Sequence, residues 1–316
     1  MNERTLDVYL AEPRGFCTGV RRAVGIVEEA LKQYGAPVFV RHEIVHNKFV
    51  IENLRAKGAV FIDELAEVPD GRPVVFSAHG VGRNVSEEAE RRGLTVLDAT
   101  CPLVAKVHRQ IARLEEDGAE IVVIGKKNHP EIIGTVGQLK HPEKAHVICS
   151  AAEAEQLALA EDATVGFVTQ TTLSVDDTAE IIGILRKKFK NLLAMSRSDI
   201  CFATTNRQGA VKALASKTAV VVIIGSANSS NSRQLRETAL KNGAAKAFLI
   251  DGAAELDFAE IGGSLGISAG ASAPEELVEG LLAELKKHYD KIKIHHVNSV
   301  KEKDLSLIHI SEPTRH

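Results

Sequence analysis

The sequence predicts an α/β fold of three related units with mostly parallel sheets, and two patterns support this prediction. Short β-branched runs alternate with stretches of helical periodicity along the whole chain, which is typical of βαβ units. An internal repeat also brings back a cysteine and a set of polar residues at nearly constant spacing. The length of 316 residues fits two ordinary domains or three small ones. We therefore expect three α/β units around a central cavity.

Eleven short apolar runs are expected to form strands. Each run contains β-branched or aromatic residues, and turn-forming residues separate it from the next segment. The runs cover residues 6–10, 37–40, 59–62, 73–76, 94–97, 120–124, 146–149, 164–168, 219–224, 246–250 and 265–268.

Amphipathic helices are expected between these strands. Residues 20–31 carry valine and leucine at helical spacing, and Gly35 follows as a stop. The same periodicity covers residues 103–114. Ser174, with Asp177 three residues later, resembles a capping box and predicts that a third helix begins there.

Composition excludes several classes of protein. The net charge of −3 gives no basic field for nucleic acid, and 4% aromatic residues without tryptophan leave few stacking platforms for single strands. The longest apolar run, residues 219–224, is too short to span a membrane, and the N-terminus lacks the pattern of an export signal. Four cysteines in such a chain favour a reducing cytoplasm and thiol chemistry over structural disulfides.

The internal repeat is measured from three of the four cysteines. From Cys17, Cys101 and Cys201, a polar residue lies 29, 28 and 30 positions further on, at His46, His129 and Asn231. A second polar position lies 71 residues after Cys101 and Cys201, at Thr172 and Ser272, and 62 residues after Cys17, at His79. Because ligands of open α/β sheets bind outside the carboxyl ends of the strands, we expect the three units to share one active site.

The repeat also gives the expected domain borders. These are residues 14–100 for the first α/β unit, 101–198 for the second, 1–13 with 199–290 for the third, and 291–304 for a C-terminal segment. Residues 305–316 read as a tail that does not belong to the native protein.

Cys17, Cys101 and Cys201 each lie where a strand-like segment gives way to a helix-like one. Thiolates are favoured at helix N-termini and bind soft metals and iron–sulfur clusters. Cys149 lies in an apolar strand without such a turn and is expected to be a buried apolar residue. The sequence has no CxxC pair. Two kinds of metal centre therefore remain as alternatives: a zinc ion bound by three cysteines and one histidine, or a four-iron cluster bound by three thiolates.

Polar residues near predicted helix starts are suited to bind an anion, especially a phosphate or diphosphate. They are His46, His79, His129, Ser229, Ser230, Asn231 and Ser272. Helix N-capping is the alternative role for the serines and the asparagine, and it is compatible with binding. Glu131 and Thr171 can form a proton-delivery pair if their loops converge. The sequence has no nucleotide-binding motif, so electrons would come from another molecule.

Nine motifs in order resemble those of the 4-hydroxy-3-methylbut-2-enyl diphosphate reductases, the enzymes of the last step of the non-mevalonate isoprenoid pathway. The similarity runs from about residue 6 to about residue 300. The motifs are PRGFCTGV, VRHEIVHN, FSAHGV, DATCPLV, GKKNHPEIIGT, TQTTLSVDDT, ATTNRQ, GSANSSNS and AGASAPEELV.

The resemblance implies a [4Fe–4S] cluster, held in the central cavity by Cys17, Cys101 and Cys201 with one iron open. It implies that the predicted anion-binding residues hold the substrate diphosphate, and that Glu131 donates a proton beside Thr171. The implied reaction is a two-electron reductive dehydroxylation that gives isopentenyl diphosphate and dimethylallyl diphosphate. The implied electron donor is reduced ferredoxin or flavodoxin.

The C-terminal end of the chain differs from the family pattern, and two other functions remain as alternatives. Family members typically end in a short apolar segment containing proline that helps to close the site, whereas this chain ends in LSLIHISEPTRH. An iron–sulfur sensor or inactive homologue would keep the cysteines without turnover. A zinc-dependent phosphohydrolase would use the same cysteines and histidines with a different metal.

Overall fold

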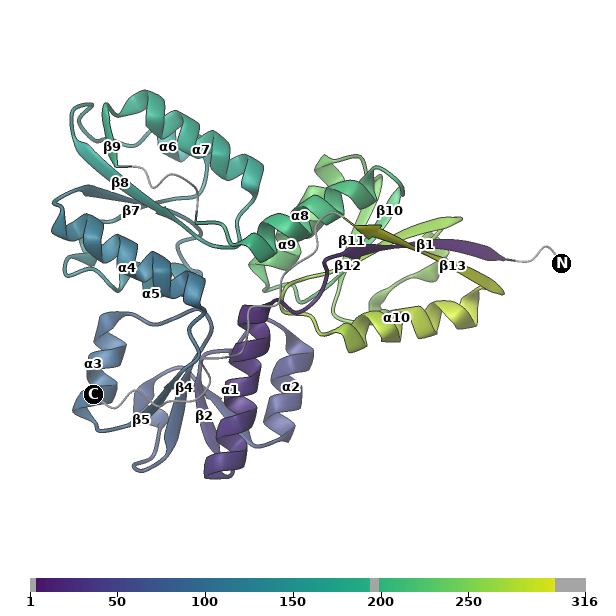
Figure 1. Ribbon diagram of the computed structural model, residues 1–316, viewed down its shortest axis with the longest axis horizontal. Coiled ribbons are helices and arrows are strands. Elements are labelled where there is room, and N and C mark those ends of the chain that lie inside the picture. The colour runs from purple at the N-terminus through teal and green to yellow at the C-terminus, as the bar shows by residue number, and fades with distance from the viewer. Residues whose placement is uncertain (1–3, 194–198, 299–316) are drawn as a thin grey trace. The chain divides into compact units, whose positions relative to one another are not determined.

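The computed structural model describes residues 4–193 and 199–298 (Figure 1). The described residues form two compact units. Unit 1 comprises residues 4–21, 46–53 and 202–298, and unit 2 comprises residues 22–45, 54–193 and 199–201. The predicted tail at 305–316 lies outside the described residues, as does 299–304 of the predicted C-terminal segment. The domain borders taken from the repeat stay a prediction.

Helices and strands alternate along the chain as expected. The helices are α1 (Thr18–Tyr34), α2 (Lys48–Ala56), α3 (Arg83–Arg91), α4 (Pro102–Glu116), α5 (Pro130–Val136), α6 (Ala151–Glu155), α7 (Val175–Lys188), α8 (Phe202–Ala215), α9 (Ser230–Lys241) and α10 (Glu275–His288). The strands are β1 (Thr5–Glu12), β2 (Val38–Arg41), β3 (Ala59–Ile62), β4 (Pro73–Phe76), β5 (Thr95–Asp98), β6 (Glu120–Ile124), β7 (His146–Ile148), β8 (Thr164–Thr169), β9 (Asn191–Leu193), β10 (Val220–Ile224), β11 (Lys246–Ile250), β12 (Ser264–Ala269) and β13 (Lys291–Asn298).

The strands form three sheets. Unit 1 holds the sheet β11-β10-β12-β1-β13, and unit 2 holds the sheets β3-β2-β4-β5 and β7-β6-β8-β9. Every strand pair described in these sheets is parallel. The prediction of an α/β fold with mostly parallel sheets is confirmed, and each of the eleven predicted runs overlaps a strand.

The three sheets share one strand order. In each sheet we count β2, β6 or β10 as the first strand. It lies between the second strand (β3, β7 or β11) and the third (β4, β8 or β12), and a fourth strand lies beside the third. In unit 1 the N-terminal strand β1 takes the fourth place, beside β12, and β13 is added beyond it. The repeat found in the sequence is therefore also a repeat of topology, in which each site cysteine follows the strand in fourth place.

Two strands, β9 and β13, were not predicted from the sequence. Strand β9 has three residues, too few for an alternating pattern to be visible. Strand β13 has the sequence KIKIHHVN, and five of its seven described side chains are exposed because it is an edge strand. It pairs with β1 over eight residues, from Thr5 opposite Lys291 to Glu12 opposite Asn298.

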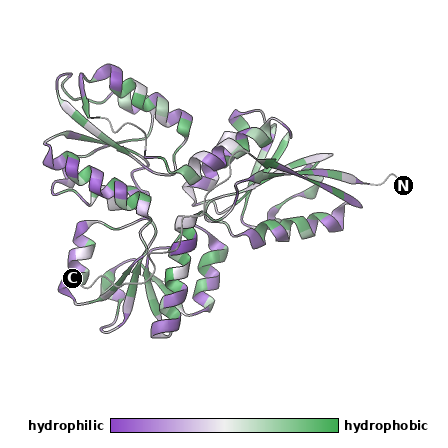
Figure 2. Ribbon diagram, viewed as in Figure 1, coloured by the Kyte–Doolittle hydropathy of each residue, from purple (hydrophilic) through white to green (hydrophobic). Residues whose placement is uncertain are grey.

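Helices cover both faces of the sheets, as Figure 1 illustrates. In unit 1, α10 packs on one face, and α8 and α9 pack on the other. In unit 2, α6 and α7 pack on one face of β7-β6-β8-β9 and α4 and α5 on the other, while α3 packs on β3-β2-β4-β5. Most strands are largely apolar, and most helices have one apolar and one polar side (Figure 2).

Two predicted helix ends are confirmed. Gly35 ends α1 with a φ of +68°, and its N–H donates to the carbonyl of Leu31 at 3.1 Å. Ser174 is the N-cap of α7, and its Oγ accepts from the N–H of Asp177 at 3.1 Å. In the described part of the chain, no helix combines the length and the apolar character needed to cross a bilayer.

Arg207 is a buried charged residue of unit 1, with 1% of its surface exposed. Its Nε and Nη2 donate to the carbonyl of Gly15 at 3.0 and 2.8 Å, and its Nη1 donates to the carbonyl of Ala203 at 3.0 Å. This side chain of α8 therefore fixes the position of the loop that leads to Cys17.

We expect Arg207→Leu to lower the free energy of unfolding by about 2–4 kcal/mol, because it leaves buried carbonyl groups without donors. Urea denaturation at neutral pH, followed by circular dichroism, measures this change. Lys286→Leu, at an exposed position of α10, is the control and should change stability by less than about 0.5 kcal/mol. An equal effect of the two variants would contradict this account of Arg207.

Candidate active site

The predicted site residues lie at one edge of each sheet, beyond the carboxyl ends of the strands. His46, His129, Ser229, Ser230 and Asn231 lie in the segments that follow the first strands β2, β6 and β10. His79, Thr171, Thr172 and Ser272 follow the third strands β4, β8 and β12. The first and third strands are neighbours, and the chain leaves them in opposite directions. Each set therefore lies at a topological switch point, where α/β sheets bind ligands.

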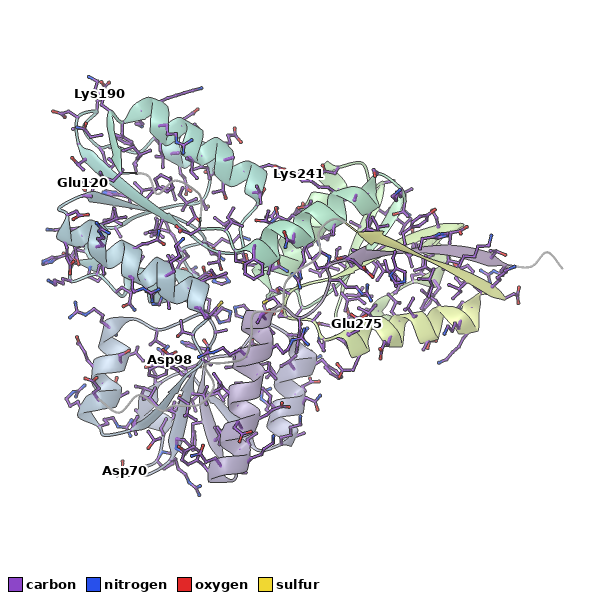
Figure 3. The ribbon with its side chains drawn as sticks, viewed as in Figure 1. Asp70, Asp98, Glu120, Lys190, Lys241 and Glu275 are labelled. Carbon is purple, nitrogen blue, oxygen red and sulfur yellow. The ribbon has the colours of Figure 1, made fainter. Side chains whose placement is uncertain are left out.

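The three repeat-related cysteines each come directly before a helix. Cys17 precedes α1, Cys101 is the N-cap of α4, and Cys201 precedes α8. The Sγ of Cys17 accepts a hydrogen bond from the N–H of Val20 at 3.4 Å. Figure 3 shows Asp98, the last residue of β5, three residues before Cys101 in the sequence. Each of the three thiols therefore lies at the N-terminus of a helix, where main-chain N–H groups stabilise negative charge.

One backbone hydrogen bond recurs at all three cysteines. The cysteine N–H donates to a carbonyl in the loop after the third strand of the sheet. The bonds run from Cys17 to Ala271 at 3.1 Å, from Cys101 to Ala78 at 3.0 Å and from Cys201 to Thr171 at 3.0 Å. Each accepting residue comes directly before one of the polar positions of the repeat, so the equivalence found by counting is also one of local structure.

In unit 1, the residues predicted to bind an anion surround the N-terminus of α9. The Oγ of Ser272 donates to the carbonyl of His46 at 2.8 Å. Ser229 is the N-cap of α9, and its Oγ accepts from the N–H of Ser232 at 3.2 Å. The predicted capping role of Ser229 is thus confirmed, and its hydroxyl is held at the start of the helix.

Asn231, in the first turn of α9, has a buried side-chain amide with 4% of the residue exposed. Neither its Oδ1 nor its Nδ2 has a hydrogen-bond partner among the described residues. A buried amide is costly when it is left unpaired, so this side chain fits the recognition of a polar ligand.

In unit 2, two histidines lie close together. His129 is the N-cap of α5, and its Nδ1 accepts from the N–H of Glu131 at 3.2 Å. The rings of His79 and His129 meet edge to face, with 5.6 Å between their centroids. The Oγ of Ser77 lies 3.4 Å from Nδ1 of His79. The loops after β4 and β6 therefore bring their histidines to one place.

Glu131 and Thr171 are in contact, as the proposed proton-delivery pair requires. One carboxylate oxygen of Glu131 accepts from the N–H of Thr171 at 2.6 Å, and the other accepts from the Thr171 Oγ at 3.0 Å. The pKa of Glu131 is raised to about 7. Burial is the main cause and the charge of Asp199 adds to it, whereas the two hydrogen bonds from Thr171 act in the opposite direction. A carboxyl group with this pKa can act as a proton donor near neutral pH.

His108, on α4, supports the loop that carries His79. Gly80, in that loop, has a φ of +75°, and a Cβ added to it would lie 2.6 Å from Cε1 of His108. Burial lowers the pKa of His108 to about 4, so the imidazole is neutral at physiological pH. The loop therefore packs against an uncharged ring.

One prediction about the cysteines is wrong. Cys149 lies one residue beyond β7 and is exposed rather than buried. Its N–H donates to Glu153 at 2.6 Å. Within the described residues, no three or more His, Cys, Asp or Glu side chains are gathered as metal ligands. Cys17 belongs to unit 1, and Cys101 and Cys201 belong to unit 2.

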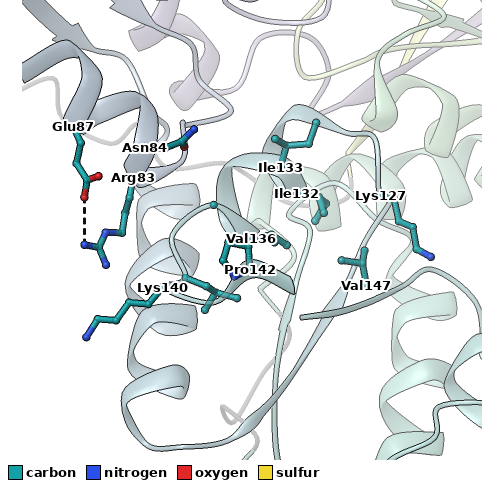
Figure 4. A pocket seen from close by; sticks show the side chains of 12 residues that line it. Arg83, Asn84, Glu87, Lys127, Ile132, Ile133, Val136, Lys140, Pro142 and Val147 are labelled. Atoms are coloured by element: carbon teal, nitrogen blue, oxygen red, sulfur yellow. Dashed lines mark hydrogen bonds and ion pairs between the residues drawn. The ribbon is translucent and has the colours of Figure 1, made fainter. Parts of the chain in front are cut away.

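A hollow of about 830 Å³ in unit 2 lies beside α5 (Figure 4). Ile132, Ile133 and Val136 of α5 line it, and Lys127 and Lys140 lie at its margin. None of the predicted site residues lines this hollow. Helix α5 therefore has an apolar side next to the hollow and a first turn that carries the buried carboxyl of Glu131.

Comparison with known proteins gives consistent matches over most of the chain. A family model described as LytB protein matches residues 8–286. The chain belongs to the LytB family. It is 54% identical over 282 residues to the 4-hydroxy-3-methylbut-2-enyl diphosphate reductase of Azoarcus sp. (strain BH72), with 89% of each chain covered. It is 55% identical over 288 residues to the reductase of the same name from Phenylobacterium zucineum, with 90% of this chain and 91% of that one covered.

Two solved reductase structures are also similar. The reductase from Plasmodium falciparum is 34% identical with a TM-score of 0.87, and the match covers 96% of this chain and 94% of that one. Another structure, described as the terminal enzyme of the non-mevalonate pathway, is 34% identical with a TM-score of 0.64, covering 89% and 99%. The predicted resemblance to this reductase family, and with it the assignment to the oxidoreductases, is confirmed.

Several residues of this LytB-family chain that shape the site were not predicted. Asp199 and Lys106 form an ion pair beside Cys201, and His108 supports Gly80. Asp199 stands two residues before a predicted ligand, in SDIC, which is the one signal in the sequence that could have drawn attention to it.

We expect Thr171→Val to raise the pKa of Glu131 above 7, because it removes the side-chain hydrogen bond that lowers this pKa. Carbon NMR of the labelled glutamate carboxyl, recorded as a function of pH, measures the shift. Thr171→Ser keeps the hydroxyl and should leave the pKa near the wild-type value. A pKa that falls in Thr171→Val would contradict the contact.

We expect Gly80→Ala to destabilise the protein more than Gly118→Ala. Gly118 has a similar φ of +71°, but nothing lies within 4 Å of an added Cβ, so its substitution introduces backbone strain alone. The contact with His108 should add about 1–3 kcal/mol to the cost at Gly80. Thermal unfolding of both variants measures the difference, and equal losses would argue against the contact.

Proposed function

We propose that this chain reduces 4-hydroxy-3-methylbut-2-enyl diphosphate to isopentenyl diphosphate and dimethylallyl diphosphate by two-electron reductive dehydroxylation. Relatives that are 54% and 55% identical carry the name of this reductase. The observation that carries the proposal is the buried carboxyl of Glu131, with a pKa of about 7, in contact with Thr171. A hydroxyl group leaves readily only as water, so the reaction requires a proton donor of this kind.

We propose that Cys17, Cys101 and Cys201 bind a [4Fe–4S] cluster. The three thiols fit this group because each lies at the start of a helix and each is fixed by the same backbone hydrogen bond. When bound, the cluster supplies electrons to the substrate and offers an iron without a protein ligand. The cysteines hold and orient this group, and the helix N-termini stabilise their negative charge.

The diphosphate of the substrate would be bound by the polar side chains at the switch points. They are His46, His79, His129, Ser229, Ser230, Asn231 and Ser272. The unpaired amide of Asn231 and the N-terminus of α9 support this assignment, since both favour an anionic ligand with many acceptor oxygens. These contacts supply binding energy and place the substrate hydroxyl for reaction.

Glu131 would deliver a proton to the leaving hydroxyl. The Thr171 hydroxyl and N–H hold the two carboxylate oxygens, so the carboxyl has one orientation. Because the protonated fraction of Glu131 falls as the pH rises through about 7, turnover that depends on this proton should fall above that pH.

Electrons would come from a small reduced protein, ferredoxin or flavodoxin, because the chain has no nucleotide-binding motif. The cysteine content supports a reducing compartment, so we propose that the enzyme acts in the cytoplasm.

Anaerobic purification followed by iron, sulfide and turnover assays tests the proposal. We expect about four irons per chain, as a [4Fe–4S] cluster requires, and consumption of the substrate with a chemical reductant. Glu131→Gln should keep its iron and lose about 100-fold or more in turnover, because the amide cannot donate the proton.

Glu116→Gln, at the exposed end of α4, is the matched control and should turn over like the wild type. Zinc in place of iron would overturn the proposal in favour of a hydrolase. Iron without turnover in the wild type would favour a sensor or an inactive homologue.

A further inference from the structure

The segments before the three cysteines differ in how they join the neighbouring strand. At Cys17 and Cys101, the N–H of the residue two positions earlier donates to the backbone carbonyl that ends the third strand. These carbonyls belong to Ala269 and Phe76, at 3.1 and 3.0 Å. Two loops are therefore fixed by a continuous backbone ladder.

At Cys201 a pair of side chains replaces this backbone bond. The N–H of Asp199 donates to the Oγ1 of Thr169 at 3.0 Å, and the N–H of Thr169 lies 3.3 Å from the carboxylate Oδ2 of Asp199. Asp199 is 8% exposed and Thr169 is 1% exposed. The two residues thus bind each other reciprocally, each through its backbone N–H and its side chain.

Lys106 balances the buried carboxylate. Its Nζ lies 3.6 Å from Oδ1 of Asp199, and it stands on α4, five residues after Cys101. A buried carboxylate is stable only with a partner charge or hydrogen bonds, and here it has both. The ion pair therefore links the helix that follows Cys101 to the segment that precedes Cys201.

The same strand end continues to the proposed proton donor. Two residues after Thr169, the carbonyl of Thr171 accepts from the N–H of Cys201, while the N–H and Oγ of Thr171 donate to Glu131. A shift of this segment would move the thiol and the carboxyl together.

We propose that Asp199 is a positioning residue that, with Thr169 and Lys106, holds the thiol of Cys201 and the backbone of Thr171 in register. This role rests on the proposed function, in which Cys201 is a cluster ligand. The other two site cysteines do not need such a residue, because the backbone ladder fixes their loops.

Amide hydrogen exchange of the full-length, cluster-free protein tests the proposal without depending on activity. In Asp199→Ala, the N–H of Cys201 should exchange about tenfold faster or more than in the wild type, whereas that of Cys101 should stay within about twofold. Thr169→Val should reproduce the selective change. Thr169→Ser, which keeps the hydroxyl, should restore slow exchange at Cys201.

Asp117→Asn, at the end of α4, is the matched control and should change neither amide. Unchanged exchange at Cys201 in Asp199→Ala and Thr169→Val would overturn the proposal. An equal acceleration at Cys101 would also overturn it, because it would mark general loss of structure.

A second readout uses the reconstituted enzyme. We expect Thr169→Val to lower kcat about tenfold with KM within about twofold, since the predicted diphosphate-binding residues are untouched. An effect on KM alone would contradict a positioning role. If the wild type binds no iron, the proposed function fails, whereas the exchange measurement still decides whether Asp199 holds the segment of Cys201.

Discussion

The local structure of the site depends on the backbone hydrogen bond between each site cysteine and the loop after the third strand. This bond is made by main-chain atoms at all three cysteines, and before Cys201 the side chains of Asp199 and Thr169 support it. The three sheets reach the same arrangement with different residues, which is why the repeat is clear in spacing and weak in sequence.

Burial sets the chemistry of the second part of the site. Glutamate is usually exposed, but Glu131 is buried, and the N–H and hydroxyl of Thr171 donate hydrogen bonds to its carboxyl group. The carboxyl consequently holds its proton to a higher pH than an exposed glutamate does. His108, in contrast, loses its charge on burial and serves as a packing surface for Gly80.

Much of this organisation could be predicted from the sequence because it is periodic. Apolar runs identify the buried strands, and the spacing of Cys17, Cys101 and Cys201 identifies the repeat. Strand β13 was missed because it is an exposed edge strand whose lysines and histidines hide the alternation. Asp199 was missed because its role follows from Thr169, 30 residues away, and no pattern in the sequence links the two. Cys149 was misjudged because the apolar strand before it ends one residue earlier than expected.

The place of β1 in its sheet has a consequence for how the chain is made. Strand β1 lies between β12 and β13, more than 250 residues further along, while the other two sheets use strands that are contiguous in sequence. During synthesis the contiguous sheets can form as soon as their strands emerge from the ribosome. Strand β1 is synthesised before both of its neighbours and must wait until β12 and β13 have been translated, so the sheet of unit 1 is completed after the other two.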